Sequence, residues 1–375
     1  MIFLNVLFLF YLCFTCRHGH GVGLHGFHFR GLEEPKSLTK ASSENITEGW
    51  IEQSLDHFNP RDNRTWSMRY YENSGHFKQG GPILIMIGGE WAISTGFLSS
   101  GTMYDIAATH NAIMYYTEHR YYGKSKPTED ISSRNLQYLG VDQALADLAY
   151  FIETKKQESG LQNSPVIVFG GSYAGSMATW IRLKYPHLVQ GALASSAPVL
   201  AKADFDEYYE VVTESLRKHS QKCVDEVEDA FVQVEELLFV KDGAKRLKQY
   251  FKQWFYQTCT EYGYYQTSNA RNSIFGSLFP LRYFTDMCAD LYGDYYDAKL
   301  LNSVVRRTNI MYGGLRPDLR NVIFTNGDID PWHALSILQN LNAFSPAILI
   351  KGIQDLVQAR AKVRKIIESW IESYV

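Results

Sequence analysis

The chain has 375 residues and a formal net charge of -3 at pH 7. Its hydrophobic fraction of 45% and mean hydropathy of -0.24 are typical of a globular protein and exclude a disordered or fibrous chain. The nearly balanced charge gives no electrostatic reason to expect nucleic acid as a partner. The length suits one large domain, or one domain with an insertion.

The first segment, residues 2–14, is almost continuously apolar and is followed by a Gly/His-rich stretch. This run is too short to span a bilayer, which needs about 20 residues. It is typical of the core of a secretory signal peptide, to which we assign residues 1–20. A buried N-terminal strand is the alternative. No other stretch is long and apolar enough to anchor the protein in a membrane.

Two Asn-x-Thr sequons begin at Asn45 and Asn63 and are predicted glycosylation sites. The cysteines are less easily explained, because two of the five lie within or beside the signal peptide. The mature chain keeps Cys223, Cys259 and Cys288. Three is an odd number for an oxidising compartment, so either one thiol is free or a partner cysteine has been lost. There is no zinc-type cluster, and we predict no metal and no other cofactor.

Short apolar runs alternate with helical patterns through the first half of the chain. Runs at 82–87, 112–116 and 165–169 are continuous, as expected for strands covered on both faces. Helical patterns lie at 141–152 and 176–185. Strands that alternate with helices predict crossover connections and a mostly parallel sheet, so the fold class is α/β.

The later part of the chain changes character and then returns to the strand pattern. Residues 191–196 form another candidate strand, whereas 204–299 is helical and charged. Strand patterns resume at 321–325 and 347–350, and an amphipathic helix follows at 356–370. We therefore expect a core in two parts, 45–203 and 300–375, with residues 204–299 inserted over one edge of the sheet.

The stretch Val166–Gly175 has the strand–Gly-x-Ser-x-small–helix pattern of a nucleophile elbow. The serine of such an elbow occupies a strained turn, so the residues two before and two after it must be small. Gly170 and Ala174 meet this requirement around Ser172. The helix that follows has a positive N-terminus, which favours developing negative charge. The pattern predicts Ser172 as a nucleophile; a plain Gly-rich turn is the alternative.

An acyl-transfer site also needs two amide donors for the oxyanion and an acid that follows the nucleophile in the chain. The N–H of Tyr173 is one expected donor, and Gly89, in the loop after an early strand, is the other. The alternative for Gly89 is a tight turn that requires positive φ. Asp328 and Asp330 both follow the strand at 321–325, and an Asx-type turn is the alternative role there.

Six motifs together resemble the lysosomal and secreted serine exopeptidases that include prolyl carboxypeptidase, the proline-cleaving lysosomal dipeptidyl peptidase and thymus-specific serine protease. They are Gln53–Phe58, Gly88–Glu90, Glu118–Ser125, Gly170–Gly175, Ala194–Pro198 and Asn326–Trp332. The resemblance implies an α/β-hydrolase core with a helical cap inserted after Pro198. It assigns the acid role to Asp330 and implies that Trp332 lines the pocket for the residue before the scissile bond, which is commonly proline in relatives.

The same resemblance implies a serine-type exopeptidase that is secreted or lysosomal and hydrolyses peptide substrates through an acyl-enzyme. Whether it would remove dipeptides from the amino end or single residues from the carboxyl end stays open. Glu90 is a candidate for holding a substrate amino group, with a supporting role behind the site as the alternative. Relatives are commonly dimers, so a homodimer is a candidate assembly.

One part of the family pattern is missing. The family carries its catalytic histidine in a loop after the last strand, but here residues 348–352 run directly into 353–360, which resemble the family's C-terminal helix. No histidine follows His333. His333 would have to fold back towards its own neighbour Asp330 to serve as the base, and His119 is better explained by a structural role. His187 lies at a predicted helix end and is expected at the surface.

The cap also looks shortened, because residues 248–252 continue directly into 253–259 where relatives have additional helices. A lost segment there would explain the unpaired cysteine. The two losses support an alternative to the peptidase: a catalytically impaired family member that binds peptide ends or a protein partner, or a truncated product.

Overall fold

The computed structural model describes residue 35 and residues 45–238, 252–270 and 274–374. The chain divides into two compact units. The core unit contains residues 45–201, 307–328 and 335–374 of the described part, and the cap unit contains 202–306 and 329–334. The predicted signal peptide, residues 1–20, lies outside the described residues.

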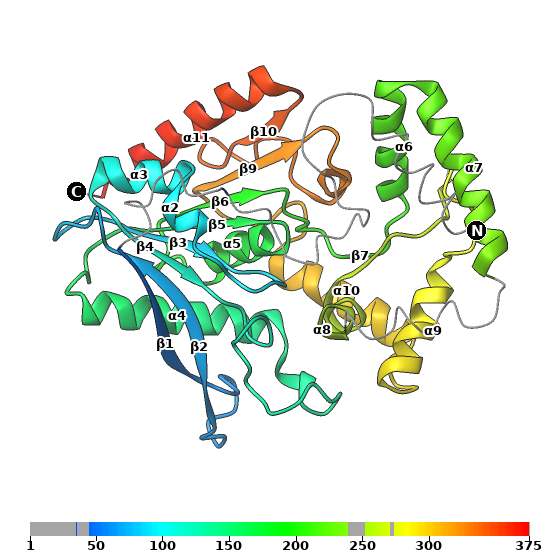
Figure 1. The fold of residues 1–375 in the computed structure, drawn as a ribbon. Helices are drawn as coiled ribbons and strands as arrows, with labels where there is room; N and C mark the ends of the chain where they lie inside the picture. The colour runs from blue at the N-terminus through cyan, green and yellow to red at the C-terminus, as the bar shows by residue number, and fades with distance from the viewer. Residues whose placement is uncertain (1–34, 36–44, 239–251, 271–273, 375) are drawn as a thin grey trace. The chain divides into compact units, whose positions relative to one another are not determined.

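The core unit is built on an eight-stranded sheet with the order β1-β2-β4-β3-β5-β6-β9-β10 (Figure 1). All neighbours from β4 to β10 are parallel, whereas β1 and β2 form an antiparallel hairpin and β2 is antiparallel to β4. The strands are β1 Ile46–Ser54, β2 Thr65–Asn73, β3 Ile83–Ile87, β4 Ile113–Thr117, β5 Val166–Gly171, β6 Gly191–Ser195, β9 Val322–Gly327 and β10 Ala347–Ile350.

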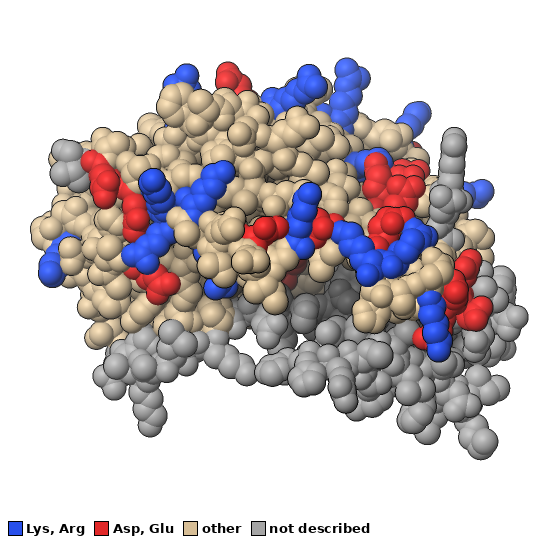
Figure 2. All heavy atoms as spheres, turned by 90° about the horizontal axis from the view of Figure 1, so that it is seen from above, with Lys and Arg blue, Asp and Glu red and all other residues tan. Residues whose placement is uncertain are grey.

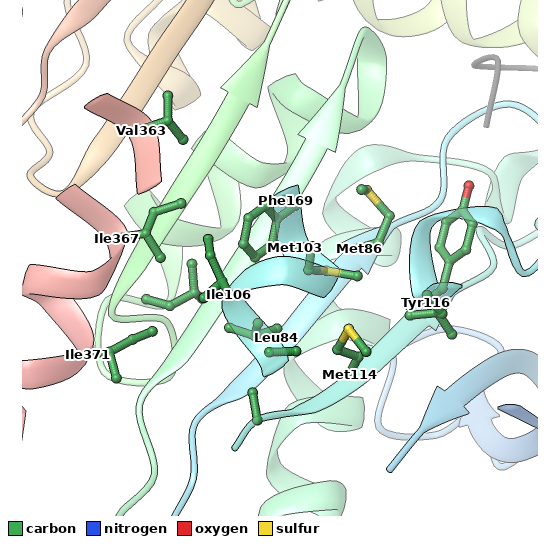
Figure 3. Close-up of a cluster of buried hydrophobic side chains, with 14 of the residues drawn as sticks. Leu84, Met86, Met103, Ile106, Met114, Tyr116, Phe169, Val363, Ile367 and Ile371 are labelled. Carbon is green, nitrogen blue, oxygen red and sulfur yellow. The ribbon is translucent and has the colours of Figure 1, made fainter. Parts of the chain in front are cut away.

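Helices cover both faces of this sheet. The short α2, Gly96–Ser99, with α3, Thr102–His110, and α11, Ile353–Glu372, lie on one face, and α4, Val141–Glu158, and α5, Tyr173–Lys184, lie on the other (Figure 1). A cluster of buried apolar side chains fills the space between the sheet and the helices α3 and α11 (Figure 3). Because β3, β4 and β5 are buried along their whole length, their sequences are continuously apolar. The core has the predicted α/β-hydrolase architecture.

The hairpin β1–β2 was not among the strands predicted from the sequence. In β1, exposed residues separate the more buried ones, and Gly49, which pairs with Tyr70, places a residue without a side chain in the middle of the strand. This pattern differs from the continuous apolar runs of the central strands, because one strand of the hairpin lies at the sheet edge.

The cap unit is mainly helical. Its elements are β7 Lys202–Asp204, α6 Glu207–His219, α7 Gln221–Leu238, α8 Lys252–Gln257, the π-helical turn Thr258–Tyr262, β8 Gly263–Tyr265 and α9 Leu281–Tyr292. Helix α10, Ala298–Tyr312, contains the boundary between the two units. The predicted insertion, 204–299, lies within the range of this unit. Residues 239–251 lie outside the described residues, and the junction of 252 with 253, where the sequence predicts that cap helices are missing, falls at the start of α8.

A disulfide joins Cys259 to Cys288 within the cap unit, and Cys223 is a free thiol. The hydroxyl of Tyr265 lies 3.4 Å from one sulfur and 3.0 Å from the other. The odd number of cysteines predicted for the mature chain therefore leaves Cys223 as the free thiol.

The surface gives little sign of a strongly charged or membrane-spanning region. Basic and acidic side chains are interspersed among the described residues of the face drawn in Figure 2. Among the helices that the structure describes, none combines the length and apolar character needed to cross a bilayer.

Candidate active site

Ser172 lies in a strained turn between β5 and α5. Its φ of 57° and ψ of -132° form a combination that residues with a side chain rarely adopt. The Ser172 N–H donates to the Ser195 carbonyl over 2.9 Å, and the Ser172 carbonyl accepts from the N–H of Gly175. The turn predicted from the Gly-x-Ser-x-small pattern is therefore present, with Ser172 partly exposed.

Gly170 shows why the pattern demands small residues. A Cβ atom at this position would lie 2.1 Å from the carbonyl oxygen of Ala174, because the strand and the helix nearly touch at the turn. Ala174 itself is fully buried. The backbone contact, rather than a side-chain preference, fixes the spacing around Ser172.

The expected oxyanion donors lie at the same edge of the sheet as this turn. Tyr173 is the first residue of α5, directly after Ser172. Strands β3 and β5 are parallel neighbours in which Met86 pairs with Phe169, so the loop that carries Gly89 leaves the sheet beside Ser172. Backbone N–H groups from both segments can therefore converge on one oxygen atom.

Gly89 is a glycine for a different reason from the positive φ considered as an alternative. Its φ is not among the positive values of the described residues, so that alternative is wrong. A Cβ atom on Gly89 would lie 2.4 Å from the ring of Trp91, which folds back beneath the loop. The Trp91 indole N–H donates to the Tyr116 hydroxyl over 2.8 Å and anchors the ring in the core.

Glu118 ties this loop to the rest of the core unit, and sequence reasoning assigned it no role. Its buried carboxylate accepts from the N–H of Ile93 at 3.2 Å and from the N–H groups of Lys124 and Ser125 at 2.9 and 3.0 Å. It also forms a buried ion pair with Arg69. The signal for this network lies in the Glu118–Ser125 motif, but Arg69 and Ile93 come from two other segments of the sequence.

Glu90 follows Gly89 and carries a buried carboxylate oxygen, Oε2, with no hydrogen-bond partner among the described residues. Burial raises the pKa of Glu90 to about 7. A carboxyl group in this state gains a partner when an amine or another donor enters the site.

His119 is a structural residue, as expected. Its Nδ1 lies 2.7 Å from the Arg120 carbonyl, which can only accept, so Nδ1 carries the proton. Its Nε2 therefore accepts from the Tyr173 hydroxyl at 3.1 Å. Burial lowers the pKa of His119 to about 4, so the ring is neutral and both nitrogens are engaged.

A second buried network lies beneath this one and was also missed. Asp147 accepts two hydrogen bonds of 2.7 Å from the Arg120 guanidinium, and its Oδ1 lies 2.7 Å from His57 Nε2. His57 and Arg120 belong to two of the motifs that carry the family resemblance. These contacts join the segment after β1 to α4. They give His57 and Arg120, and so the two motifs that contain them, a role in holding the fold together rather than in catalysis.

The connection after β10 contains only Lys351 and Gly352 before α11 begins at Ile353. The structure therefore has no loop at the place where the resemblance implies a histidine. No described side chain hydrogen-bonds to the Ser172 hydroxyl. His187, at the C-terminal side of α5, is exposed, as predicted.

Asp330 and Trp332 belong to the cap unit, in residues 329–334. Asp330 Oδ1 accepts from the Trp332 N–H at 3.0 Å, which is the Asx-type turn considered as an alternative role. Its other oxygen, Oδ2, is buried and has no partner among the described residues. His333 forms no ion pair with Asp330 in the described structure, and its Nδ1 is likewise unpaired.

The two predicted glycosylation sites lie at the surface of the core unit. Asn45 immediately precedes β1, and Asn63 lies between β1 and β2. Both side chains are exposed and so is the threonine of each sequon.

Comparison with known families gives a match to the serine carboxypeptidase S28 family at residues 53–253 and 249–361. The chain belongs to this family. The S28 match falls into two pieces that meet at 249–253, where the sequence predicts that cap helices are missing.

Similarity to individual S28 relatives also supports membership of this family. The chain is 32% identical to the thymus-specific serine protease of Mus musculus over 414 aligned positions, which cover 81% of this chain and 80% of the relative. The alignment is longer than the 375 residues of this chain, so it includes positions that the relative has and this chain lacks. The lysosomal Pro-X carboxypeptidase of Homo sapiens is 37% identical over 57% of this chain and 44% of its own length.

Solved structures with a similar arrangement are more distant. They include the proline iminopeptidase of Mycobacterium smegmatis, with 12% identity and a TM-score of 0.44 over 87% of this chain and the whole of that chain. An acylaminoacyl peptidase gives 10% identity and a TM-score of 0.45 over 88% of this chain and 42% of that chain.

Proposed function

We propose that this S28 chain carries the acyl-transfer and peptide-binding site of a serine exopeptidase, centred on Ser172. The observation that carries the proposal is the strained backbone of Ser172 at the end of β5, which holds the hydroxyl away from the sheet. Strain of this kind costs about 1–3 kcal/mol and persists at functional sites.

In this proposal, Ser172 Oγ attacks the scissile carbonyl while a base accepts its proton. The N–H groups of Tyr173 and Gly89 donate to the oxygen that becomes negative. The scissile C–N bond then breaks as the base passes the proton to the leaving amine, and water hydrolyses the resulting acyl-enzyme. Asp330 is the acid that would orient the base. Glu90 holds a substrate amino group, and Trp332 lines the pocket for the residue before the scissile bond. The names of the S28 relatives support a peptide with proline at that position.

A catalytically impaired protein that still binds peptide ends is the second candidate, and one observation favours it for this chain. Only Lys351 and Gly352 separate β10 from α11, so the loop that bears the base in relatives has no counterpart. Removing the histidine of a comparable triad costs on the order of 10⁶ in turnover. The oxyanion donors and binding pocket alone leave about 10³–10⁴ of rate acceleration over water.

The predicted signal peptide and the exposed sequons at Asn45 and Asn63 support a secreted or lysosomal location. The lysosomal Pro-X carboxypeptidase relatives agree with it. Peptides are the proposed ligands, and a homodimer is the proposed assembly.

A fluorophosphonate probe separates the two candidates. The full-length chain and a Ser172→Ala control are incubated with the probe, and the labelled peptide is mapped by mass spectrometry. If Ser172 is labelled rapidly in the wild type and the Ser172→Ala control stays unlabelled, the chain is a peptidase whose base comes from elsewhere in the chain. A folded chain that stays unlabelled but binds peptide establishes the impaired protein, and an insoluble chain contradicts both.

A further inference from the structure

Three aromatic rings of the cap unit, Phe205, Tyr208 and Tyr264, surround Trp332, and the four residues are here called the Trp332 cluster. The centroid of the Trp332 ring lies 5.5 Å from Phe205, 5.7 Å from Tyr208 and 5.6 Å from Tyr264. Phe205 and Tyr264 are buried and form the back of the cluster, whereas Tyr208 and Trp332 are partly exposed. The rings of Tyr208 and Trp332 are therefore accessible to a ligand, with two buried rings packed against Trp332.

The Asp330 carboxylate lies beside this cluster. Asp330 Oδ1 is held by the N–H of Trp332, which leaves Oδ2 buried and unpaired within the described residues. Burial raises the pKa of Tyr208 to about 12, and the charges of Tyr209 and Asp330 contribute in the same direction. Asp330 is thus close enough to the Tyr208 ring to act on it electrostatically.

No basic side chain neutralises Asp330 in the described part of the chain. Lys202, at the start of the cap unit, instead pairs with Asp206 at 3.2 Å and with Glu207. His333, three residues after Asp330, makes no ion pair with it. A buried carboxylate oxygen without a hydrogen-bond donor raises the free energy of the folded protein. A positively charged ligand that donates to Asp330 Oδ2 would remove this penalty without first displacing another cation.

We infer that Asp330 and the Trp332 cluster bind an organic ammonium group, specifically the free amino terminus of a short peptide. Cations are attracted to the faces of Trp and Tyr rings, and an ammonium N–H can donate to Asp330 Oδ2. The inference rests on the proposed function in taking peptides as ligands. It departs from that function by giving the contact with the ligand amine to Asp330 rather than to Glu90, and Asp330 is available for it because no histidine pairs with its carboxylate among the described residues.

The test compares two ligands that differ in one charge. Phe-Pro-amide and N-acetyl-Phe-Pro-amide are titrated into the full-length chain by calorimetry. The free amine is expected to bind at least tenfold more tightly, and raised salt should reduce this preference. Equal affinities, or no binding of either ligand, would overturn the inference.

Variants identify the carboxylate responsible. Asp330→Asn should abolish the preference for the free amine, while Asp328→Asn, a matched change two residues away, should leave it intact. If Glu90→Gln abolishes the preference and Asp330→Asn does not, Glu90 holds the amine and the inference fails. Should Asp330→Asn not fold, Trp332→Leu provides a second variant, for which about fivefold weaker binding of the free amine is expected and unchanged binding counts against the cluster.

Ser172→Ala keeps this test independent of the proposed peptidase. It removes the nucleophile but touches neither Asp330 nor the Trp332 cluster, so its preference for the free amine should match that of the wild type. A chain that is unlabelled by the fluorophosphonate probe and still prefers the free amine loses the peptidase function but keeps the amine site.

Discussion

The carboxylate of Glu118 and the guanidinium of Arg69 form a buried ion pair, and each partner also hydrogen-bonds to the backbone of Ile93. Glu118 Oε1 accepts from the Ile93 N–H, and Arg69 Nη2 donates to the Ile93 carbonyl at 3.3 Å. The ion pair thereby holds the far end of the loop that begins with Gly88 and Gly89. Both charged groups are almost completely buried, so each needs the opposite charge of the other to offset its loss of hydration.

Replacing Glu118 with Gln should therefore destabilise the core unit by about 3–5 kcal/mol, because it leaves the buried Arg69 uncompensated. Urea unfolding measures the change. Glu48→Gln is the matched control, since Glu48 also pairs with Arg69 but is one-third exposed, so its loss should destabilise the core unit far less. Similar effects from the two variants would contradict the distinct role of the buried pair.

Ser172→Gly should stabilise the protein while removing the nucleophile. Glycine adopts the backbone conformation of Ser172 without strain, although it is more flexible in the unfolded chain. A net gain of about 0.5–1 kcal/mol is expected in thermal unfolding. Ser172→Ala keeps the strained Cβ and should show no such gain; a gain of the same size there would mean that the hydroxyl, rather than the backbone, is the source.

The stability of the protein should fall with rising pH because of Glu90. Burial raises the pKa of Glu90 in the folded state to about 7, above its ordinary value of 4.5, so the folded state binds the proton more tightly. This contribution is full below pH 4.5 and is lost as the pH rises through 7. Glu90→Gln should remove it, so the variant gains stability relative to the wild type between pH 5 and pH 8, on the order of 1–3 kcal/mol. A pH-independent difference between the two proteins would show that Glu90 titrates normally.

Loss of the Cys259–Cys288 disulfide should destabilise the cap unit. The two cysteines are 29 residues apart, and closing a loop of this length stabilises a fold by about 3–4 kcal/mol through the unfolded state. Cys259→Ser with Cys288→Ser is compared with Cys223→Ser, which removes only the free thiol. Equal melting temperatures for the wild type and the double variant would mean that the bridge does not form.

The central strands and the turn at Ser172 were predictable because local sequence determines them. Continuous apolar runs marked β3, β4 and β5, and small residues marked the elbow. The β1–β2 hairpin lacked such a run. The reason for Gly89 was also missed, since it depends on the ring of Trp91 folding back on the loop rather than on φ.

The networks around Glu118 and Asp147 could not be derived from spacing. Arg69, Ile93 and the Glu118–Ser125 motif come from three different segments, and the strand order of the sheet brings them together. A sequence indicates that a carboxylate is buried only when its charged or hydrogen-bonding partners can be recognised, and these need not be near it in the chain. The Asx-type turn at Asp330 was among the stated alternatives because its partner is two residues away.

The short connection between β10 and α11 also has an engineering consequence. Lys351, Gly352 and Ile353 are exposed, and a Cβ atom added to Gly352 would meet nothing within 4 Å. Residues inserted at this junction would extend into solvent without displacing packed atoms. We therefore expect the core unit to fold both without a histidine-bearing segment at this junction and with one grafted there.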